Sequence, residues 1–506
     1  MHPGIFAASR PQHAAVVLHP SGATQTYAEL DAAANRIAHV MRELGLTRGD
    51  RIAILLPNHP RYLEIAWAAQ RSGLYYVPVN HHLTPAETAY IVSDCGARLL
   101  VGSADLLAVV AAEASDVEHV VTVDGDLPGA HRYHQLCAAQ SAEPLPDAAE
   151  GAWMFYSSGT TGRPKGIVPG AVGAPLGTVT PFDRIVRDRF GYDDDLRYLV
   201  SAPLYHAAPL GWSMAAHRVG GTVVVLESFD AEQCLAAIEQ HRITHAQFVP
   251  THFVRMLKLP EAVRNAYDLS SLQVVIHAAA PCPVEVKEAM IDWLGPIVTE
   301  FYSGSEGIGF CMISTDEWLA HRGSVGRPAL GIPHILDDQG RELTSGQVGE
   351  IWFETPATFA YHGDPDKTAG AWNDRGWATF GDLGSLADDG YLYLADRRAD
   401  LVISGGVNVY PREAEDVLIL HPAIIDVACV GVPDTEYGQV LVAAVQPAVA
   451  AASGEDLLTA LDGFVRERLS GFKCPRRYVV LEEIPRLPTG KVLRRELLSV
   501  LENHAT

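Results

Sequence analysis

The apolar positions of the chain follow a helical spacing in some segments and form continuous runs in others. Between Thr26 and Gly45 the apolar side chains recur every three or four residues, at Leu30, Ala34, Ile37, Met41 and Leu44. This spacing predicts an amphipathic helix, and Thr26 with Glu29 predicts a capping box at its start. Arg51 to Leu56 is a continuous apolar run, which predicts a buried strand.

The alternation of helices and strands continues along the chain. The same criteria predict helices at 62–71 and 85–94 and strands at 75–79, 98–101, 152–156, 223–226, 245–249 and 273–276. Such alternation is typical of parallel sheets covered by helices. From Gly349 to Tyr393 the pattern changes to short strands, at 349–353 and 390–394, separated by Pro, Gly and Asp turns, which predicts a β-rich subdomain.

A charged break at 396–400 precedes an α+β tail of about a hundred residues, a normal size for a domain. We therefore expect an α/β protein with a large N-terminal domain of stacked α/β sheets plus the β-rich subdomain (1–396). A hinge (397–400) and a small mobile α+β C-terminal domain (401–506) complete the expected organisation.

Composition narrows the classes of partner. The 506 residues carry a formal net charge of −23, which disfavours nucleic acid and anionic membranes as partners. The seven cysteines form no C-x-x-C pair, as expected of reduced thiols. The first residues lack the pattern of a signal peptide, and no apolar run is long enough for a membrane span, so we expect a soluble cytoplasmic protein.

Residues 156–166 form a run of small, hydroxylated and glycine residues that ends in Lys165 and Gly166. Its backbone N–H groups, hydroxyls and lysine suit a polyphosphate. The run differs from a P-loop because Pro164 precedes the lysine and Gly166 follows it. Apolar strands on both sides favour a phosphate loop over a flexible linker. The expected phosphate ligands are Ser157, Ser158, Gly159, Thr160, Thr161, Gly162 and Lys165.

The phosphate loop and four further motifs, 301–307, 379–383, 396–415 and 485–491, occur in the order found in the adenylate-forming superfamily. This superfamily comprises acyl-CoA synthetases, luciferases and peptide-synthetase adenylation domains, and the resemblance runs from about residue 10 to residue 500. The resemblance implies activation of a carboxylic acid by ATP and transfer of the acyl group to a thiol. It also implies the cofactors ATP, Mg²⁺ and coenzyme A.

The resemblance assigns the ATP site residue by residue. Lys491, Glu306 and Thr161 are expected to be catalytic, with Lys491 stabilising charge at the α-phosphate. Ser305 and Glu306 offer oxygen ligands to Mg²⁺. Tyr302 is expected to stack on adenine, and Asp382 to accept hydrogen bonds from the ribose hydroxyls. The remaining expected ATP contacts are Ala279, Ala280, Pro281, Ser303 and Arg397.

The expected acyl-binding residues are mainly small or apolar: Tyr205, His206, Ala207, Thr251, His277, Ala278 and Gly304. His206 resembles the gate residue of fatty-acyl and aryl ligases. His277, which stands where glycine is commoner, either shapes the acyl pocket or is a hydrogen-bonded core histidine. The lining favours a hydrophobic acid, with a fatty or alicyclic, steroid-type acid ranked first and an aryl acid second.

For the thiol step the resemblance assigns Ser404, Gly405, Gly406, Tyr437, Phe472 and Lys473 to CoA, the last three only weakly. The expected hinge pivot is Ala399, where the family usually has aspartate or lysine. Free CoA is the expected acceptor, and a carrier protein is the alternative acceptor. A luciferase-type oxygenation and a degenerate sensor of acyl adenylates are alternative functions. A homodimer is compatible with the resemblance.

Overall fold

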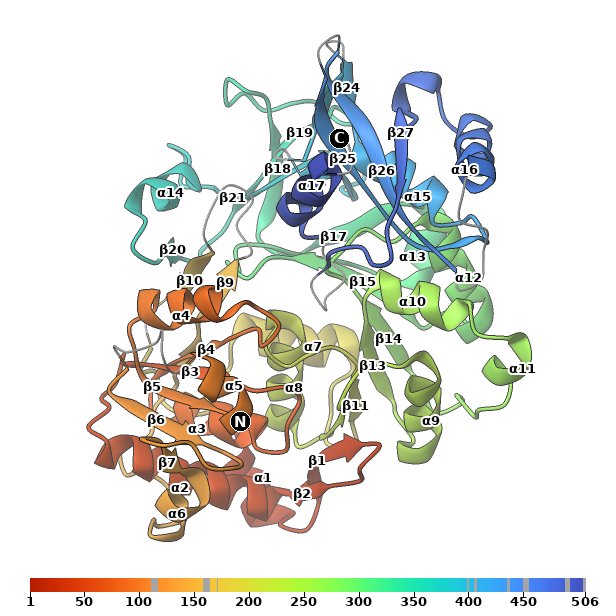
Figure 1. The fold of residues 1–506 in the computed structure, drawn as a ribbon. Helices are drawn as coiled ribbons and strands as arrows, with labels where there is room; N and C mark the ends of the chain where they lie inside the picture. Colours follow the sequence, from red (N-terminus) through yellow and green to blue (C-terminus); the bar gives the residue numbers. More distant parts are fainter. Residues whose placement is uncertain are drawn as a thin grey trace.

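The N-terminal domain is built around two sheets that share a layer of helices (Figure 1). The computed structural model describes residues 1–110, 117–157, 164–170, 172–397, 400–404, 407–434, 437–448, 455–486 and 492–503. Side chains on β3 (Arg51–Leu55) alternate between two cores: Ile52 and Ile54 face the shared helix layer, and Ala53 and Leu55 face the opposite side. This alternation is the period of two expected for a strand covered on both faces.

The first sheet is parallel throughout its described strands. Its order is β7 (His131–Arg132), β6 (His119–Thr122), β5 (Ala97–Gly102), β3, β4 (Tyr75–Pro78) and β8 (Ala152–Trp153).

The second sheet changes from parallel to antiparallel along its width. Its parallel part is β15 (Val298–Ser303), β14 (Val274–His277), β13 (His245–Phe248), β11 (Arg197–Val200), β12 (Thr222–Leu226) and β1 (Ala14–His19), edged by β2 (Thr24–Thr26). Its antiparallel part is β16 (Phe310–Ile313), β17 (Ser324–Leu330), β22 (Leu392–Arg397), β21 (Ala378–Leu386), β19 (Gly349–Glu354) and β18 (Ile332–Leu336). The antiparallel strands have a core of their own around Ile351 and Phe353, which confirms the expected β-rich subdomain.

The remaining described elements are two small sheets and the helices. The small sheets are β20 (Phe359–Tyr361), β10 (Lys165–Pro169) and β9 (Phe155–Ser157), and, in the C-terminal domain, β24 (Val407–Val409), β23 (Val402–Ser404), β26 (Gly438–Pro447) and β25 (Ile424–Asp434), with β27 (Arg477–Val480) beside β26. The helices are α1 (Pro3–Ser9), α2 (Tyr27–Glu43), α3 (Tyr62–Arg71), α4 (Pro85–Asp94), α5 (Ala104–Val110), α6 (Tyr133–Ala138), α7 (Pro181–Phe190), α8 (Ala207–Val219), α9 (Ala231–His241), α10 (Pro250–Leu257), α11 (Glu261–Arg264), α12 (Val284–Leu294), α13 (Thr315–Ala320), α14 (Pro365–Gly370), α15 (Pro411–Leu418), α16 (Glu455–Arg466) and α17 (Arg494–Asn503), with a 3₁₀ turn at Gly471–Lys473.

The pattern of apolar positions predicted the first helices closely. α2 starts with the expected capping box, in which Thr26 and Glu29 bond each other's backbone, and α3 and α4 have the expected bounds. The expected strand at 152–156 is wrong as one element. The chain leaves the first sheet after Trp153, where β8 ends, and β9 joins the small sheet with β10.

The C-terminal domain packs against the N-terminal domain through α15 and β25. Arg412 donates to the carbonyl of Leu394 at 3.1 Å, and Lys258 on α10 donates to the carbonyl of Ile424. Figure 1 shows β24 at the outer end of this domain, on the side away from β15. Among the described residues, every helix is too short or too polar to span a bilayer. All seven cysteines are buried and unpaired, as the sequence predicted.

A buried histidine in the shared helix layer makes stability depend on pH. His217 on α8 accepts from Trp67 Nε1 at 3.0 Å, and its Nε2 bonds the carbonyl of Ala15 at 3.0 Å. Burial lowers the pKa of His217 to about 4, so below pH 6.5 the unfolded chain binds a proton that the folded protein excludes. We expect the melting temperature to fall as the pH is lowered from 7 to 4.5. In His217→Gln, thermal unfolding should depend less on pH, whereas an unchanged slope would contradict this assignment.

Candidate active site

The candidate ATP and acyl residues lie at the carboxyl ends of adjacent parallel strands. β11, β13, β14 and β15 are neighbours in the second sheet, and the chain leaves them at Tyr205–His206, Thr251, Ala278–Pro281 and Ser303–Glu306, respectively. In open α/β sheets this edge is where ligands bind. The fold therefore brings together motifs that are about a hundred residues apart in the sequence.

The phosphate loop is flanked by β9 and β10, which pair antiparallel as the two strands of a hairpin. Lys165 pairs with Ser157 and Gly166 with Tyr156 between β10 and β9, and β20 pairs with the other edge of β10. Ser158, Gly159, Thr160, Thr161 and Gly162 lie outside the described residues. Lys165 Nζ is 3.4 Å from Asp364 Oδ2, so the lysine that closes the loop is held beside the start of α14.

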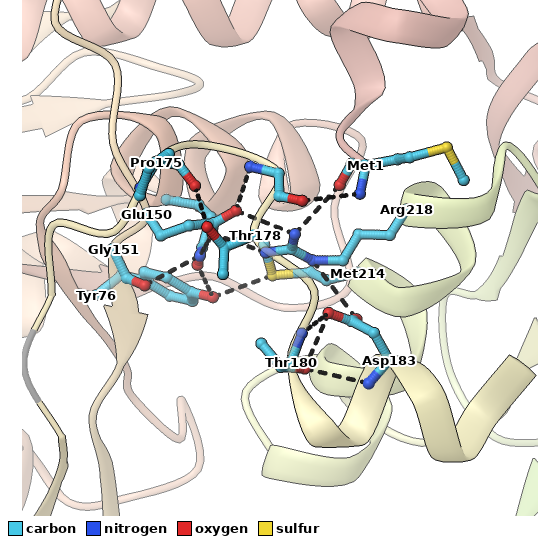
Figure 2. Close-up of polar contacts among 12 residues, drawn as sticks. Met1, Tyr76, Glu150, Gly151, Pro175, Thr178, Thr180, Asp183, Met214 and Arg218 are labelled. Atoms are coloured by element: carbon cyan, nitrogen blue, oxygen red, sulfur yellow. Dashed lines mark hydrogen bonds and ion pairs between the residues drawn. The ribbon is translucent and has the colours of Figure 1, made fainter.

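A buried ion pair ties the start of the segment that carries this hairpin to helix α8 (Figure 2). Arg218 on α8 donates to both carboxylate oxygens of Glu150, at 3.0 and 2.7 Å. The same carboxylate accepts from the backbone N–H of Gly177 at 2.6 Å, and the backbone of Glu150 bonds Gly173 and Ala174 at 2.7 Å each. The hairpin therefore projects from a base that is fixed to the core helix α8.

Glu306, an expected metal ligand, lies beside the base of the hairpin. Tyr361 on β20 donates to Glu306 Oε1 at 3.0 Å, and β20 is paired with β10. Lys367 Nζ lies 4.2 Å from the ring centre of Tyr361, and the pKa of Lys367 is lowered by burial, although Glu306 opposes this shift. The base of the phosphate hairpin, the Glu306 carboxylate and the Lys367 amine thus lie close together.

The donor set around Glu306 fits a magnesium ion that is held mainly by nucleotide. Ser305 and Glu306 supply a hydroxyl and a carboxylate, both hard oxygen donors. Within the described part of the chain, no three His, Cys, Asp or Glu side chains gather in a way that would hold a metal by themselves. Mg²⁺ in such sites takes one or two protein ligands and completes its shell with phosphate oxygens and water.

Gly304 is the point where the second and third motifs touch. A Cβ atom at this position would lie 2.4 Å from Phe380 Cε1 and 2.7 Å from Glu306 Oε2. Phe380 also packs edge-on against Tyr302, with ring centres 5.7 Å apart. A glycine here lets the Phe380 ring and the Glu306 carboxylate approach the same backbone.

Gly304→Ala is therefore expected to displace Phe380 or Glu306 and to lower kcat/KM for ATP by about tenfold to a hundredfold. Steady-state kinetics with varied ATP measure this effect. Gly370→Ala is the matched control, because its Cβ would meet no atom within 4 Å and its φ is not positive. Equal activity of the Gly304 and Gly370 variants would contradict the proposed contact.

Tyr302, Asp382 and Arg397 converge from three strands. The Tyr302 hydroxyl donates to Asp382 Oδ2 at 2.7 Å, and Asp382 lies opposite Arg397 in the register of β21 and β22. Tyr302 itself is on β15, next to β14 and the residues that follow it. The structure thus brings the expected adenine and ribose residues together.

The small residues after β14 include a strained one. Ala279 has φ of +74°, and Ala278 before it is buried whereas Ala279 and Pro281 are exposed. A non-glycine residue in this region costs about 1–3 kcal/mol, and such residues concentrate at binding sites. Ala280 is half-buried in the same turn. The conformation suits close approach of a ligand to the backbone.

The expectation that His277 lines the acyl pocket is not supported by its position. His277 is fully buried and lies against Phe253 and Glu300, with its Nε2 3.5 Å from Glu300 Oε2. Glu300 in turn bonds Lys287 on α12 at 2.7 Å. The neighbouring Ile276 and Ala278 belong to the core on the opposite face of the sheet, because adjacent strand residues point to opposite faces. The position is that of a core histidine, although neither ring nitrogen has a hydrogen-bond partner among the described residues.

The other acyl candidates surround the start of α8. Tyr205 is buried, His206 is the N-cap of α8, and Ala207 is its first residue. Burial lowers the pKa of His206 to about 3, helped by His81 and His82, so this imidazole stays neutral at physiological pH. Thr251 is half-buried in the first turn of α10.

The CoA candidates lie on the C-terminal domain. Ser404 on β23 pairs with Gly438, next to Tyr437, and the Tyr437 ring is 4.8 Å from the Arg476 guanidinium carbon. Phe472 is half exposed, and Lys473 pairs with Glu413 at 2.5 Å. Gly405, Gly406, Ala399 and Lys491 lie outside the described residues. The hinge and these roles remain predictions.

Comparison with known families identifies the chain. The model of the AMP-binding enzyme family matches residues 5–361, and that of the AMP-binding enzyme C-terminal domain matches residues 413–491. The chain belongs to the AMP-binding enzyme family. The resemblance to the adenylate-forming superfamily, and to its acyl-CoA synthetases in particular, is thereby confirmed.

Relatives of this AMP-binding enzyme act on different acids and acceptors. It is 34% identical over 492 residues to a feruloyl-CoA synthase of Amycolatopsis sp, covering 96% of this chain and 95% of that protein. It is 33% identical over 487 residues to the fatty acid–[acyl-carrier-protein] ligase ScoC of Streptomyces coeruleorubidus, covering 94% and 91%. The crystal structure of ATP-bound MatB from Rhodopseudomonas palustris superposes with a TM-score of 0.82 at 26% identity over the full length of both chains.

These findings make the AMP-binding enzyme an ATP-dependent, AMP-forming acid–thiol ligase of the acyl-CoA synthetase type. Enzymes of this type use ATP, Mg²⁺ and CoA, as the sequence led us to expect.

Four residues of this AMP-binding enzyme's site were missed from the sequence: Tyr361, Asp364, Lys367 and Phe380. Phe380 lies inside the third motif, and its bulk beside Gly381 is the signal in the sequence that could have identified it. Tyr361 is the last residue of β20, and Asp364 and Lys367 come after it. No local pattern connects these three residues to Lys165 or Glu306. Only the pairing of β20 with β10 brings them to the site.

Proposed function

We propose that this AMP-binding enzyme activates a hydrophobic monocarboxylic acid and transfers the acyl group to free CoA. The convergence of Tyr302, Asp382, Glu306 and the phosphate hairpin at one sheet edge is the observation that carries the proposal. A carboxylate is unreactive toward thiols because its leaving group would be oxide. Conversion to an acyl adenylate replaces oxide with AMP, a much better leaving group.

In the first half-reaction a carboxylate oxygen attacks the α-phosphorus of ATP, and the bond to the pyrophosphate oxygen breaks. Tyr302 and Asp382 bind the nucleoside, and Lys165 binds the phosphates. Magnesium, when bound at Ser305 and Glu306, neutralises charge on the phosphate oxygens. Lys491 stabilises the charge that develops at the α-phosphate.

In the second half-reaction the CoA thiolate attacks the acyl carbon, and AMP leaves. The outer position of β24 supports a rotation of the C-terminal domain between the two steps, because the proposed CoA residue Ser404, whose strand β23 pairs with β24, must come to the site. Alanine at position 399 replaces a polar pivot, so the balance between the two orientations is set by other contacts.

The acyl lining supports an acid whose acyl part is hydrophobic and carries no charge. The small side chains of Ala207 and Ala278 lie in one apolar core, and the acyl candidates include no carboxylate to pair an amine. A fatty or alicyclic acid fits this lining. An aryl acid is the second candidate, favoured by the aromatic group behind Ala278, in which Trp212 lies 5.3 Å from Phe301 and Phe301 stacks on Phe310 at 5.0 Å between ring centres.

A panel of fatty, steroidal and aromatic acids tests the acid and the acceptor together. Each acid is incubated with ATP and Mg²⁺, and either CoA or a phosphopantetheinylated carrier protein is the acceptor. We expect one class of acid to give AMP and acyl-CoA. Pyrophosphate release with acyl transfer only to the carrier protein would support the carrier-loading alternative, and no pyrophosphate with any acid would overturn the proposal.

The oligomeric state, for which a homodimer is proposed, is measured by light scattering.

A further inference from the structure

Four side chains near the start of α8 bury polar atoms that have no partner among the residues that the structure describes. These atoms are Tyr62 Oη, His81 Nδ1, Tyr205 Oη and His206 Nε2. Tyr62 is fully buried on α3, and Tyr205 is 3% exposed. His81 follows β4, so the four residues come from three separate segments of the chain. We call them the Tyr62–His206 cluster.

Three members of the cluster are in ring contact, and Tyr62 lies near Tyr205. The ring of His81 lies edge-on to Tyr205 with centres 5.1 Å apart, and the rings of Tyr205 and His206 are 4.4 Å apart. The pKa of Tyr62 is raised by burial and further by the nearby Tyr205 hydroxyl. The four side chains that carry the unpartnered atoms therefore lie near one another.

A buried polar atom without a partner is costly, and most such atoms in proteins are satisfied by protein, water or ligand. Four together, beside residues at which the acyl group is expected, point to a group that the protein takes up. Lys165 at the phosphate hairpin pairs with the charged Asp364, whereas the side-chain contacts within this cluster are between aromatic and imidazole rings. The cluster thus differs in chemistry from the ATP site.

The hydrogen-bonding pattern selects the class of group. His81 is bonded to the backbone of Leu56, and its Nδ1 is the nitrogen without a partner. Burial lowers the pKa of His81 to about 4 and that of His206 to about 3, so both imidazoles are neutral at pH 7. A neutral His81 that donates through Nε2 presents an acceptor at Nδ1, while Tyr205 offers a hydroxyl donor. A hydroxyl satisfies both, because it donates one hydrogen bond and accepts another.

We propose that the Tyr62–His206 cluster binds a hydroxyl substituent of the acyl group, so that the enzyme prefers hydroxylated acids. The inference rests on the proposed function and adds the polar part of the substrate to it. Tyr205 and His206 were expected to contact the acyl group, whereas Tyr62 and His81 are new specificity residues. The pantetheine arm of CoA carries a hydroxyl and amides of similar chemistry, so the test separates the two sources.

The test compares cinnamic acid with 4-hydroxycinnamic acid, and octanoic acid with 8-hydroxyoctanoic acid, in pyrophosphate release without CoA. Wild type should favour the hydroxylated member of at least one pair. Tyr205→Phe removes only a hydroxyl and should lower the ratio of kcat/KM for that member to kcat/KM for the unsubstituted acid about 2- to 10-fold. Tyr62→Phe is the second variant, so the result does not depend on one substitution folding well.

Tyr192→Phe is the matched control. Tyr192 is also buried with an unpartnered hydroxyl, but it packs against Tyr198 and Trp212, away from the cluster. It should leave the discrimination unchanged. Equal losses for both acids of a pair, or no loss in either cluster variant, would overturn the proposal and assign the atoms to buried water.

A loss confined to KM for CoA, measured with preformed acyl adenylate, would also overturn the acyl assignment, because it would place pantetheine at the cluster. The failure of every acid to release pyrophosphate from the wild-type enzyme would be a failure of the proposed function and not of the cluster alone.

Discussion

Lys491→Ala is expected to lower the rate of acyl-adenylate formation by about 10²- to 10³-fold, the loss typical when a group that stabilises transition-state charge is removed. Lys491 ends the motif 485–491. The described residues on either side hold the ends of this motif together: Arg486 pairs with Val492, and Leu493 donates to the carbonyl of Pro485 at 2.8 Å. Arg486 is bound by Asp426 at 2.7 and 2.8 Å, which fixes the motif to β25. Pyrophosphate release without CoA measures this step.

The effect of Lys491→Ala should be confined to the first half-reaction. Thioester formation from a preformed acyl adenylate should stay within about threefold of wild type, because the lysine acts only while the α-phosphate is attacked. Arg495→Ala is the charge-matched control, since Arg495 is exposed on α17 next to the motif. If both half-reactions slowed equally in Lys491→Ala, the assigned role would be wrong.

Glu306→Gln is expected to lower the rate of pyrophosphate release by about a hundredfold and to raise the concentration of Mg²⁺ needed for half-maximal rate. The amide keeps the size of the side chain but removes the negative charge that a hard cation prefers. Initial rates over a magnesium titration measure both quantities. A hundredfold loss corresponds to about 2.7 kcal/mol of transition-state stabilisation.

Tyr361→Phe is the companion variant, because it removes only the hydrogen bond to Glu306 Oε1 and leaves the carboxylate in place. We expect a loss of about 2- to 10-fold, the usual effect of one hydrogen bond. If Tyr361→Phe matched Glu306→Gln, the carboxylate would act through its position beside β20 and not through its charge. If neither variant changed the magnesium titration, Glu306 would not be a metal ligand.

Local sequence patterns predicted much of the fold because helix capping and apolar spacing depend on residues that are close in the sequence. The capping box at Thr26 and the helical spacing after it predicted α2, and both bounds of α3 and α4 followed from apolar runs and turn residues. The strand expected at 152–156 failed because its two halves belong to different sheets. Sheet membership depends on partners elsewhere in the chain, which a local apolar run does not contain.

The site residues likewise divide into those that the motifs predicted and those that depend on contacts between distant segments. Tyr302 and Asp382 were expected from motifs, and the structure joins them by a hydrogen bond. Tyr361 was missed because it reaches Glu306 only through the pairing of β20 with β10. For His277 the sequence left an acyl-pocket role and a core role open, and the alternation of side chains on β14 turns it toward Glu300, on the face opposite Ala278. Facing is decided by strand register, which the motif alone does not fix.

In the proposed mechanism the acid is activated as an acyl adenylate, and this step can be followed with an isotope. It is tested most directly by supplying the best acid of the panel with ¹⁸O in its carboxylate and analysing the products by mass spectrometry. If a carboxylate oxygen attacks the α-phosphorus, one ¹⁸O atom appears in AMP and none in pyrophosphate. Label in inorganic phosphate with formation of ADP, or AMP without label, would contradict the account.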